Sequence, residues 1–337
     1  MVSIRSFIGL VALSTVLALP VPIARPDSEA LSIPTKREVS SELKALADGN
    51  EQFRASISSS PQPTLLKQLT DDGQAPPFMF LGCSDSRVSE GTIFNAKPGT
   101  LFTQRNIANQ FHHTDANTHS VLSYAVAELG VKHVIVMGHY GCGGVAAAIA
   151  TPPEAPIDAA NGAVQNWIDP IRQIFATSTR PEIVELREKN KGKAVVEEPE
   201  PQEPGFRALV EENVKAGVNS IVKDSVLANH FALLSKEGGG NKTIEGRSEG
   251  GPAVDVFVHG FVYDIENGEI KDLGISVGPP DKPIPEIPFP VINESKPTAL
   301  AAAVTVNNGS HESKSPRAAC EEQCKSKRSL FGHSHAH

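Results

Sequence analysis

The chain has 337 residues, of which 39% are hydrophobic and 21% charged, and its formal net charge is −8 at pH 7. This composition is typical of a globular protein with one large domain or two small ones. The acidic balance, together with the lack of any Lys/Arg-rich stretch interleaved with aromatic residues, excludes nucleic acid from the expected partners.

The N-terminus has the pattern of a secretory signal peptide. Arg5 precedes an uncharged apolar run from Phe7 to Leu19, and Val16 and Ala18 are small residues suited to a cleavage site. We therefore predict a signal peptide over residues 1–18 and a secreted, extracellular protein. The run is shorter than the roughly 20 apolar residues that span a bilayer, so no membrane partner is expected after cleavage. An uncleaved anchor is the alternative.

Residues 19–37 form either a propeptide or a linker. They end at the dibasic pair Lys36-Arg37, which a processing protease could recognise. Three N-x-S/T sequons, at Asn241, Asn293 and Asn308, agree with secretion and predict a glycoprotein, although such sequons also occur by chance.

Helices and strands are predicted to alternate along the first half of the chain. A helix is expected from about 38 to 58, where apolar residues recur at helical spacing. Short apolar runs of the kind buried on both faces of a parallel sheet predict strands at 78–82, 101–103 and 131–137. Further helices are expected at 120–129 and from 144 to 150.

The second half resumes this pattern after an interruption. The stretch 189–204, rich in Glu, Lys and Pro, predicts an exposed insertion, and a helix broken near Asp224 follows over 206–234. A strand over 253–263 leads through an Asn-Gly turn into a hairpin strand at Ile270. From 278 to 337 the chain is rich in Pro, then in Ala, Ser and Lys. With no packing pattern after Pro290, we expect a disordered tail, with roughly the last 45 residues poorly ordered.

This alternation predicts an α/β fold with a central, mainly parallel β-sheet flanked by helices and with the first helix as an N-terminal arm. The carboxyl ends of the strands then meet at one edge, where ligands bind in open α/β sheets. Cys83 and the pair His139 and Cys142 follow two of these strands closely. We therefore expect their side chains to meet at this edge.

Two thiols and an imidazole, with the carboxyl of Asp85 nearby, suit Zn²⁺ acting as a Lewis acid on water. Four cysteines in a secreted chain would otherwise suggest two disulfides. The spacing assigns Cys83 and Cys142 to a metal instead, and it leaves Cys320 and Cys324, in the polar tail, as candidates for a local disulfide.

Four short motifs identify a family when they occur together. They are C-S-D-S-R from Cys83, R-N-I-A-N from Arg105, H-T-D-A-N from His113 and H-Y-G-C-G-G from His139. In this combination they resemble β-class carbonic anhydrases, and the match extends from about residue 38 to residue 273. The resemblance implies a β-carbonic anhydrase catalytic domain over 38–277. It also implies one Zn²⁺ per subunit, with Cys83, His139 and Cys142 as its ligands.

The resemblance further implies that Asp85 and Arg87 are a catalytic dyad. The guanidinium holds the carboxylate off the metal, so that Asp85 can orient a zinc-bound hydroxide toward CO2. Such help is needed, because two thiolates and a neutral imidazole leave the site formally neutral and its water less acidic than in a three-histidine site. A surface salt bridge is the alternative interpretation of the pair.

Substrate contacts are also assigned by the resemblance. Gln74 is expected to donate a hydrogen bond to a substrate oxygen, and the main-chain N–H of Gly143 to contact bicarbonate. Phe102, Ile107 and Tyr124 are expected to line the CO2 pocket, some of them from the partner subunit. Residue type alone would favour ordinary core packing for these three side chains.

The predicted function is reversible hydration of CO2 to bicarbonate and a proton. One alternative is hydrolysis of CS2 or COS on the same fold, and another is a secreted zinc-binding protein without turnover, which the Asp85–Arg87 pair argues against. Family members assemble as dimers, so a homodimer or a dimer of dimers is expected.

Three further features lie outside the assigned site. His112, His113 and His119 are candidate proton shuttles, although a structural role is the more common one for histidine. Phe80 stands where family members with an inhibitory bicarbonate pocket have Trp, so we expect that form of regulation to be weak or absent. The terminal histidines at 333, 335 and 337 could bind a transition metal with the tail cysteines, but a solvated tail is the preferred interpretation.

Overall fold

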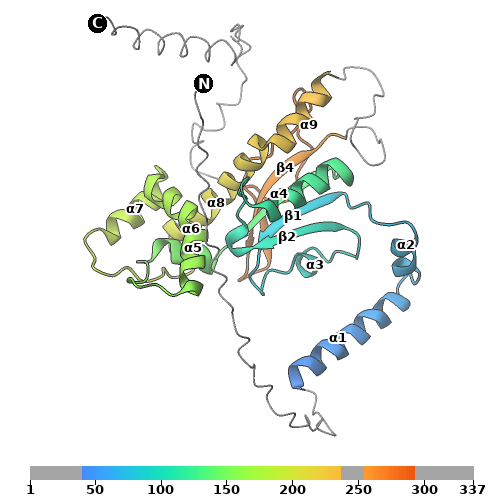
Figure 1. The fold of residues 1–337 in the computed structure, drawn as a ribbon, viewed down its shortest axis with the longest axis horizontal. Helices are drawn as coiled ribbons and strands as arrows, with labels where there is room; N and C mark the ends of the chain where they lie inside the picture. Colours follow the sequence, from blue (N-terminus) through green and yellow to red (C-terminus); the bar gives the residue numbers. More distant parts are fainter. Residues whose placement is uncertain (1–39, 237–253, 293–337) are drawn as a thin grey trace, which may run out of the picture. The chain divides into compact units, whose positions relative to one another are not determined.

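The computed structural model describes residues 40–236 and 254–292 (Figure 1). The chain divides after Leu65 into two compact units. Helix α1 (Ser41–Ser58) lies in the first unit, and the sheet and the remaining helices from Leu66 onward lie in the second. The predicted signal peptide, propeptide, sequons, tail cysteines and tail histidines lie outside the described residues.

A five-stranded sheet forms the centre of the second unit, with strand order β2-β1-β3-β4-β5. The first four strands are parallel, and β5 pairs antiparallel with β4 across the predicted Asn-Gly turn. The predicted mainly parallel α/β fold is therefore confirmed. The strands are β1 (Phe78–Cys83), β2 (Leu101–Asn106), β3 (His133–His139), β4 (Phe257–Asp264) and β5 (Glu269–Asp272).

Helices flank this sheet, and α8 packs along β3 and β4 (Figure 1). None of the helices within the described ranges combines the length and the apolar character that crossing a bilayer requires. Besides α1, the helical segments are α2 (Leu65–Asp71), α3 (Glu90–Ile93), η1 (Ile107–Asn109), α4 (Ala116–Ser123), η2 (Tyr124–Glu128), α5 (Gly143–Ile149), α6 (Ala159–Thr177), α7 (Pro181–Asn190), α8 (Pro204–Lys223) and α9 (Ser225–Lys236).

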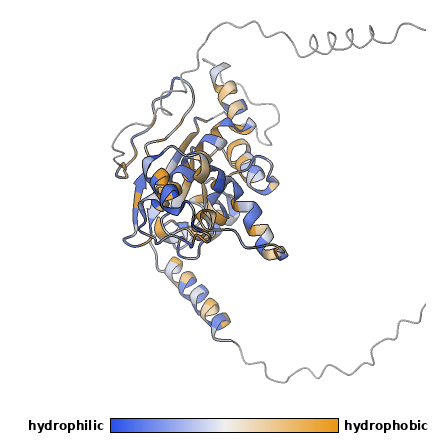
Figure 2. Cartoon of the chain, turned by 90° about the vertical axis from the view of Figure 1, so that its left-hand side faces the viewer, coloured by the Kyte–Doolittle hydropathy of each residue, from blue (hydrophilic) through white to orange (hydrophobic). Residues whose placement is uncertain are grey.

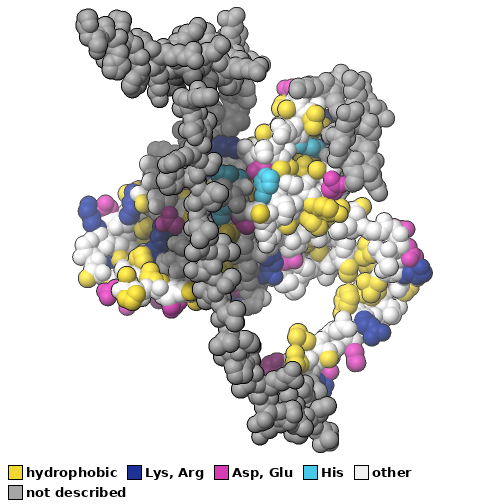
Figure 3. Space-filling model, in the orientation of Figure 1, with side chains coloured by type: hydrophobic (Ala, Val, Ile, Leu, Met, Phe, Trp, Pro, Cys, Tyr) yellow, Lys and Arg dark blue, Asp and Glu magenta, His cyan; other side chains and the backbone are white. Residues whose placement is uncertain are grey.

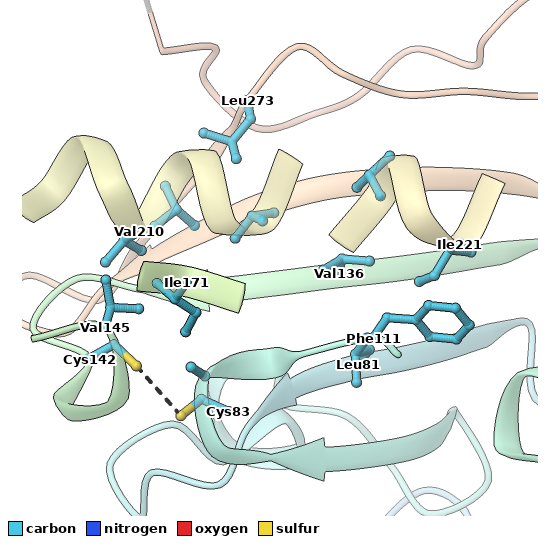
Figure 4. Close-up of a cluster of buried hydrophobic side chains, with 14 of the residues drawn as sticks. Leu81, Cys83, Phe111, Val136, Cys142, Val145, Ile171, Val210, Ile221 and Leu273 are labelled. Carbon is cyan, nitrogen blue, oxygen red and sulfur yellow. Dashed lines mark hydrogen bonds between the residues drawn. The ribbon is translucent and has the colours of Figure 1, made fainter. Parts of the chain in front are cut away.

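The core follows from the apolar runs that predicted the strands. Alternate residues of a strand point to opposite faces of the sheet, so a run that is apolar throughout is buried on both faces. In β1, Leu81 packs in the larger hydrophobic cluster and Phe80 in a second, smaller one. Hydrophobic residues gather toward the interior of this unit (Figure 2), and Figure 4 shows Leu81, Val136 and Ile221 within the larger cluster.

Several predicted boundaries were wrong by a few residues. The helix expected at 120–129 begins at Ala116, because the carboxylate of Asp115 accepts hydrogen bonds from the N–H groups of Asn117 and Thr118. From Tyr124 it continues as a π-helical turn. The strand expected from 253 begins at Phe257, and β2 extends to Asn106 rather than ending at 103.

The helix expected over 206–234 is indeed broken at Asp224, which caps the N–H of Val226 at the start of α9. The predicted exposed insertion is shorter than 189–204, since α7 ends at Asn190 and α8 begins at Pro204. Residues between these helices are mostly exposed. Helices α2, α3, α6 and α7 had not been predicted.

Packing also continues past residue 277, the predicted end of the domain. Phe289 packs edge-on against Phe261 with ring centroids 5.1 Å apart, and Val291 forms a β-bridge with Asp272. Ile292 packs against the larger core cluster. The Pro-rich segment up to Ile292 is therefore part of the folded unit, and the expectation of no packing after Pro290 was wrong.

Helix α1 carries apolar side chains that are exposed. Ser40 caps the helix, accepting a hydrogen bond from the N–H of Leu43, so the helix starts slightly later than the predicted residue 38. Leu43 is 62% exposed, Leu46 72% and Phe53 41%. Hydrophobic and hydrophilic residues alternate along α1 (Figure 2), and its apolar side chains are visible at the surface of the helix (Figure 3).

Candidate metal centre

Three ligand-type side chains converge at the carboxyl edge of the sheet. Cys83 is the last residue of β1, His139 is the last residue of β3, and Cys142 is the N-cap of α5. Because β1 and β3 are neighbouring parallel strands, their carboxyl ends meet. The two sulfurs are 3.9 Å apart (Figure 4), and the three ligand atoms, all on buried residues, lie within 4.8 Å of one another.

This geometry fits a tetrahedral divalent metal. Zn–S bonds of about 2.3 Å at tetrahedral angles place two sulfurs about 3.8 Å apart, close to the separation of Cys83 and Cys142. Nδ1 of His139 lies 3.0 Å from the main-chain oxygen of Tyr140, which can only accept, so Nδ1 carries the hydrogen and Nε2 the lone pair. Nε2 is buried without a hydrogen-bond partner among the described residues, an arrangement that costs free energy unless a ligand engages it.

The two thiols influence each other's ionisation. The hydrogen bond from Cys142 lowers the pKa of Cys83 to about 4, and the same pairing raises the pKa of the more deeply buried Cys142. Without a cation the pair therefore readily holds a single thiolate. A bound metal ion supplies the positive charge that allows both sulfurs to ionise.

Asp85 and Arg87 form a bidentate ion pair beside these ligands. Nε of Arg87 donates to Oδ1 of Asp85 over 2.9 Å, and Nη2 donates to Oδ2 over 2.6 Å. The Arg87 side-chain hydrogen bonds lower the pKa of Asp85 to about 2, against the effect of partial burial. Oδ2 lies only 3.7 Å from Nε2 of His139, so the ionised carboxylate borders the cluster of ligand atoms while Arg87 holds it.

Arg105 fixes the loop that carries this pair. Its Nε donates to the main-chain oxygen of Cys83 over 2.8 Å, and its Nη2 donates to that of Asp85 over 2.6 Å. A carboxylate oxygen of Glu90 lies 3.7 Å from its Nη1. Arg105 therefore ties the end of β2 to the turn after β1, and it fixes the backbone positions of Cys83 and Asp85.

Comparisons with known proteins agree with this geometry. A family model described as "Carbonic anhydrase" matches residues 78–234. A carbonic anhydrase of Emericella nidulans is 34% identical over 203 residues, which cover 60% of this chain and 72% of that one. A solved β-carbonic anhydrase of Aspergillus fumigatus is 30% identical with a TM-score of 0.52, and 69% of this chain and 91% of that one are covered. The chain belongs to the β-class carbonic anhydrases.

Other solved members show the same fold. Tetrameric β-carbonic anhydrases of the filamentous ascomycete Sordaria macrospora include a chain 28% identical to this one, with a TM-score of 0.51 and coverage of 70% of this chain and 98% of that one. A β-carbonic anhydrase of Coccomyxa, solved with acetazolamide, has a TM-score of 0.53 at 26% identity, covering 71% and 89% of the respective chains. The chain is thus a carbonic anhydrase of fungal type.

Two of the predicted substrate contacts lie next to the metal-ligand loop of this carbonic anhydrase. Gly143 is the exposed first residue of α5, directly after Cys142. Ile107 packs against the next residue, since a Cβ added at Gly144 would lie 2.7 Å from its Cγ2. Ile107 is nevertheless 39% exposed, so it is not the ordinary core residue that its type alone would favour.

The other predicted contacts differ in burial, since Phe102 is half-buried against the larger core cluster whereas Tyr124 and Gln74 are exposed. Phe102 and Tyr124 stack with ring centroids 5.6 Å apart, and Tyr124 is 47% exposed. Gln74 is exposed in the segment between α2 and β1. These three residues are not brought into the immediate surroundings of the ligand atoms within one chain, and their substrate roles remain predictions.

A hollow of about 380 Å³ opens beside the site. Trp167, from the unpredicted helix α6, closes one side and donates its Nε1–H to the main-chain oxygen of Ile107 over 2.8 Å. His112 packs edge-on against the same indole. The lining residues are Ser84, Gln104, Arg105, Asn106, Ile107, Asp115, Asn117 and Trp167.

The three candidate shuttle histidines occupy different environments. Burial lowers the pKa of His112, which contacts Trp167. His119 lies 3.3 Å from the buried carboxylate of Asp224, a contact typical of a structural histidine. His113 is exposed. Only His112 is therefore linked, through the indole, to the hollow beside the site.

Two residues of the site's surroundings were missed in the sequence. Arg105 lies in the R-N-I-A-N motif. Its role could have been predicted from its place at the carboxyl end of a strand, but the predicted strand ended at residue 103 and not at Asn106. Trp167 is the only tryptophan in the chain, but nothing local connects it with Ile107, which lies 60 residues earlier.

Proposed function

We propose that this protein hydrates CO2 reversibly to bicarbonate and a proton with one Zn²⁺ per subunit, held by Cys83, His139 and Cys142. Zn²⁺ at these ligands supplies Lewis-acid activation of a water molecule. The observation that carries the proposal is the buried Cys–His–Cys cluster. Its sulfur spacing matches tetrahedral zinc, and Nε2 of His139 has no hydrogen-bond partner within the described ranges.

Asp85 would orient the attacking water. Its carboxylate accepts three hydrogen bonds from Arg87, one of them from the main-chain N–H, so both its position and its ionised state are fixed. It retains lone pairs that can accept the O–H of a water beside the ligand atoms. That water would have to lose its other proton to solvent or buffer before its oxygen adds to the carbon of CO2, and Asp85, fixed by Arg87, would hold it for the attack without reorganisation of the dyad.

Substrate would sit between apolar and polar walls. Ile107 provides an apolar surface for CO2, which has no net dipole. The main-chain N–H of Gly143 is in the first turn of α5, where N–H groups have no intrahelical acceptor and can donate to an anion such as bicarbonate. The product gains a negative charge as it forms, so this donor favours the product side of the attack.

We further propose a homodimer or a dimer of dimers. Tyr124 and the α1 side chains Leu43 and Leu46 are apolar or aromatic groups left largely exposed in a single chain. Such surfaces commonly mark contacts with a partner. The solved Sordaria macrospora relatives are described as tetrameric. A second copy would cover these groups, and Gln74, Phe102 and Tyr124 could then complete the neighbouring subunit's pocket.

Stopped-flow CO2 hydration on protein of measured zinc content tests the proposal. Asp85→Ala should abolish most turnover and leave about one zinc per chain, whereas Asp72→Ala, at an exposed position outside the site, should match the unmodified protein. Zinc-loaded protein that turns over neither CO2 nor a competing gas substrate would favour the zinc-binding alternative. Preference for CS2 or COS in competition would favour the hydrolase alternative.

A further inference from the structure

Tyr140 links the proposed zinc ligand His139 to the rest of the fold. Its N–H donates to the main-chain oxygen of Tyr263 over 3.0 Å, which extends the pairing of β3 with β4 one residue past His139. Its carbonyl accepts the Nδ1–H of His139. Gly141 follows with a φ of +71°, so the chain turns immediately afterwards. The orientation of the Tyr140 peptide therefore sets the plane of the His139 imidazole.

The side chain of Tyr140 is held from two directions by helix α8. Its hydroxyl donates to Oε1 of Glu211 over 2.6 Å, and the guanidinium carbon of Arg207 lies 3.4 Å from the centroid of its ring. Arg207 and Glu211 are four residues apart in the helix and so lie on one face. Tyr140 is only 6% exposed, which leaves it little room to adopt another rotamer.

Both α8 residues are themselves anchored by ion pairs. Oε2 of Glu211 lies 2.6 Å from Nη1 of Arg180, the N-cap residue of α7, and Nη2 of Arg207 lies 2.9 Å from Oδ2 of Asp264 at the end of β4. Buried ion pairs seldom add net stability, since desolvation offsets their attraction, and apolar replacements of similar volume are often neutral or stabilising. The network is therefore better explained as a means of holding the Tyr140 side chain in one orientation than as a source of fold stability.

We propose that Glu211 and Arg207 are positioning residues of the metal site, which act through Tyr140 to fix the carbonyl that orients His139. The inference rests on the zinc coordination proposed above. Groups that orient a ligating histidine through its second nitrogen commonly change metal affinity or activity by about 10–100-fold when they are altered. Because Glu211 and Arg207 act through one intervening residue, we expect effects near the lower end of that range.

The test compares matched variants of the zinc-loaded full chain. Tyr140→Phe removes the hydroxyl but keeps the ring under Arg207, and Glu211→Gln removes the charge but keeps the shape. Both should release zinc to a chelator about tenfold faster than the unmodified protein and shift the visible d–d bands of the Co²⁺-substituted protein. Glu188→Gln removes the same charge from an exposed side chain of α7 that pairs with Lys191, so it should leave both readouts unchanged.

If folded Tyr140→Phe and Glu211→Gln proteins show the release rate and Co²⁺ spectrum of the unmodified chain, the inference is overturned while the proposed function stands. If Tyr140→Phe does not fold, Arg207→Lys replaces it, since it keeps the charge and loses the planar group over the ring. Faster zinc release and shifted Co²⁺ bands in that variant support the inference, and their absence overturns it. Unmodified protein that binds no zinc would overturn the proposed function, and this inference with it.

Discussion

Acid should destabilise this protein through a pair of histidines on neighbouring strands, His133 at the start of β3 and His259 in β4. Nδ1 of His133 lies 2.9 Å from Nε2 of His259, whose Nδ1 lies 2.8 Å from Oγ of Ser276. His259 is 2% exposed and stacks on Phe261. Burial, and to a lesser degree the neighbouring His133, lower the pKa of His259 to about 4. Burial and Lys132 lower that of His133 in the same direction.

The sign and size of the effect follow from linkage. A histidine with a lowered folded-state pKa takes up its proton in the unfolded chain first, at an ordinary pKa near 6.5, so unfolding is favoured as the pH falls below that value and down to about 4. For His259 alone, these two pKa values give a loss of about 2 kcal/mol in unfolding free energy between about pH 7 and pH 5. His133 adds to this loss.

Denaturant unfolding of the zinc-loaded protein at fixed concentration, at several pH values across this window, measures the slope. His259→Gln keeps a polar group near the position of Nε2 but cannot titrate. Between about pH 7 and pH 5 its unfolding free energy should therefore fall by about 2 kcal/mol less than that of the unmodified protein. His113→Gln, at an exposed histidine, should behave like the unmodified protein, and any acid-driven loss of zinc is common to all three. Equal slopes for His259→Gln and the unmodified chain would refute the reasoning.

Three other outcomes are expected. Gly205→Ala should cost about 1–3 kcal/mol in unfolding free energy, because its Cβ would lie 2.5 Å from Cβ of Leu186 and 2.6 Å from a main-chain oxygen of α7. Gly162→Ala, with open space around it, should be neutral or stabilising, and equal effects of the two substitutions in thermal melts would contradict this prediction. Added bicarbonate should not inhibit the enzyme cooperatively in a pH titration of activity, because the fully buried Phe80 has no side-chain N–H to donate to a bound bicarbonate. Strong cooperative inhibition would contradict this prediction. N-terminal sequencing of secreted protein should begin at or after Leu19, and deletion of residues 1–18 should retain the protein in the cell; secretion without that segment would rule out its role.

The strands and the sheet edge were predictable because their signals are local. Runs such as Phe78–Cys83 and His133–His139 are apolar enough to be buried on both faces, and this property alone favours strands in a parallel sheet. Helix α6 was not predictable in the same way. It contains Pro170, a helix breaker by local preference, yet Ile168 and Ile171 are buried in the core, and this packing outweighs the local cost.

The same contrast applies to the site. Short motifs at the ends of strands were enough to predict Cys83, His139 and Cys142 as metal ligands, because such motifs carry both the chemistry and its place in the fold. Which nitrogen of His139 is available, and what holds its ring in place, depends instead on contacts that the fold creates. The partner that fixes Tyr140 is Glu211, 71 residues along the chain, and the packing of α8 on β3, not any local pattern, brings the two together.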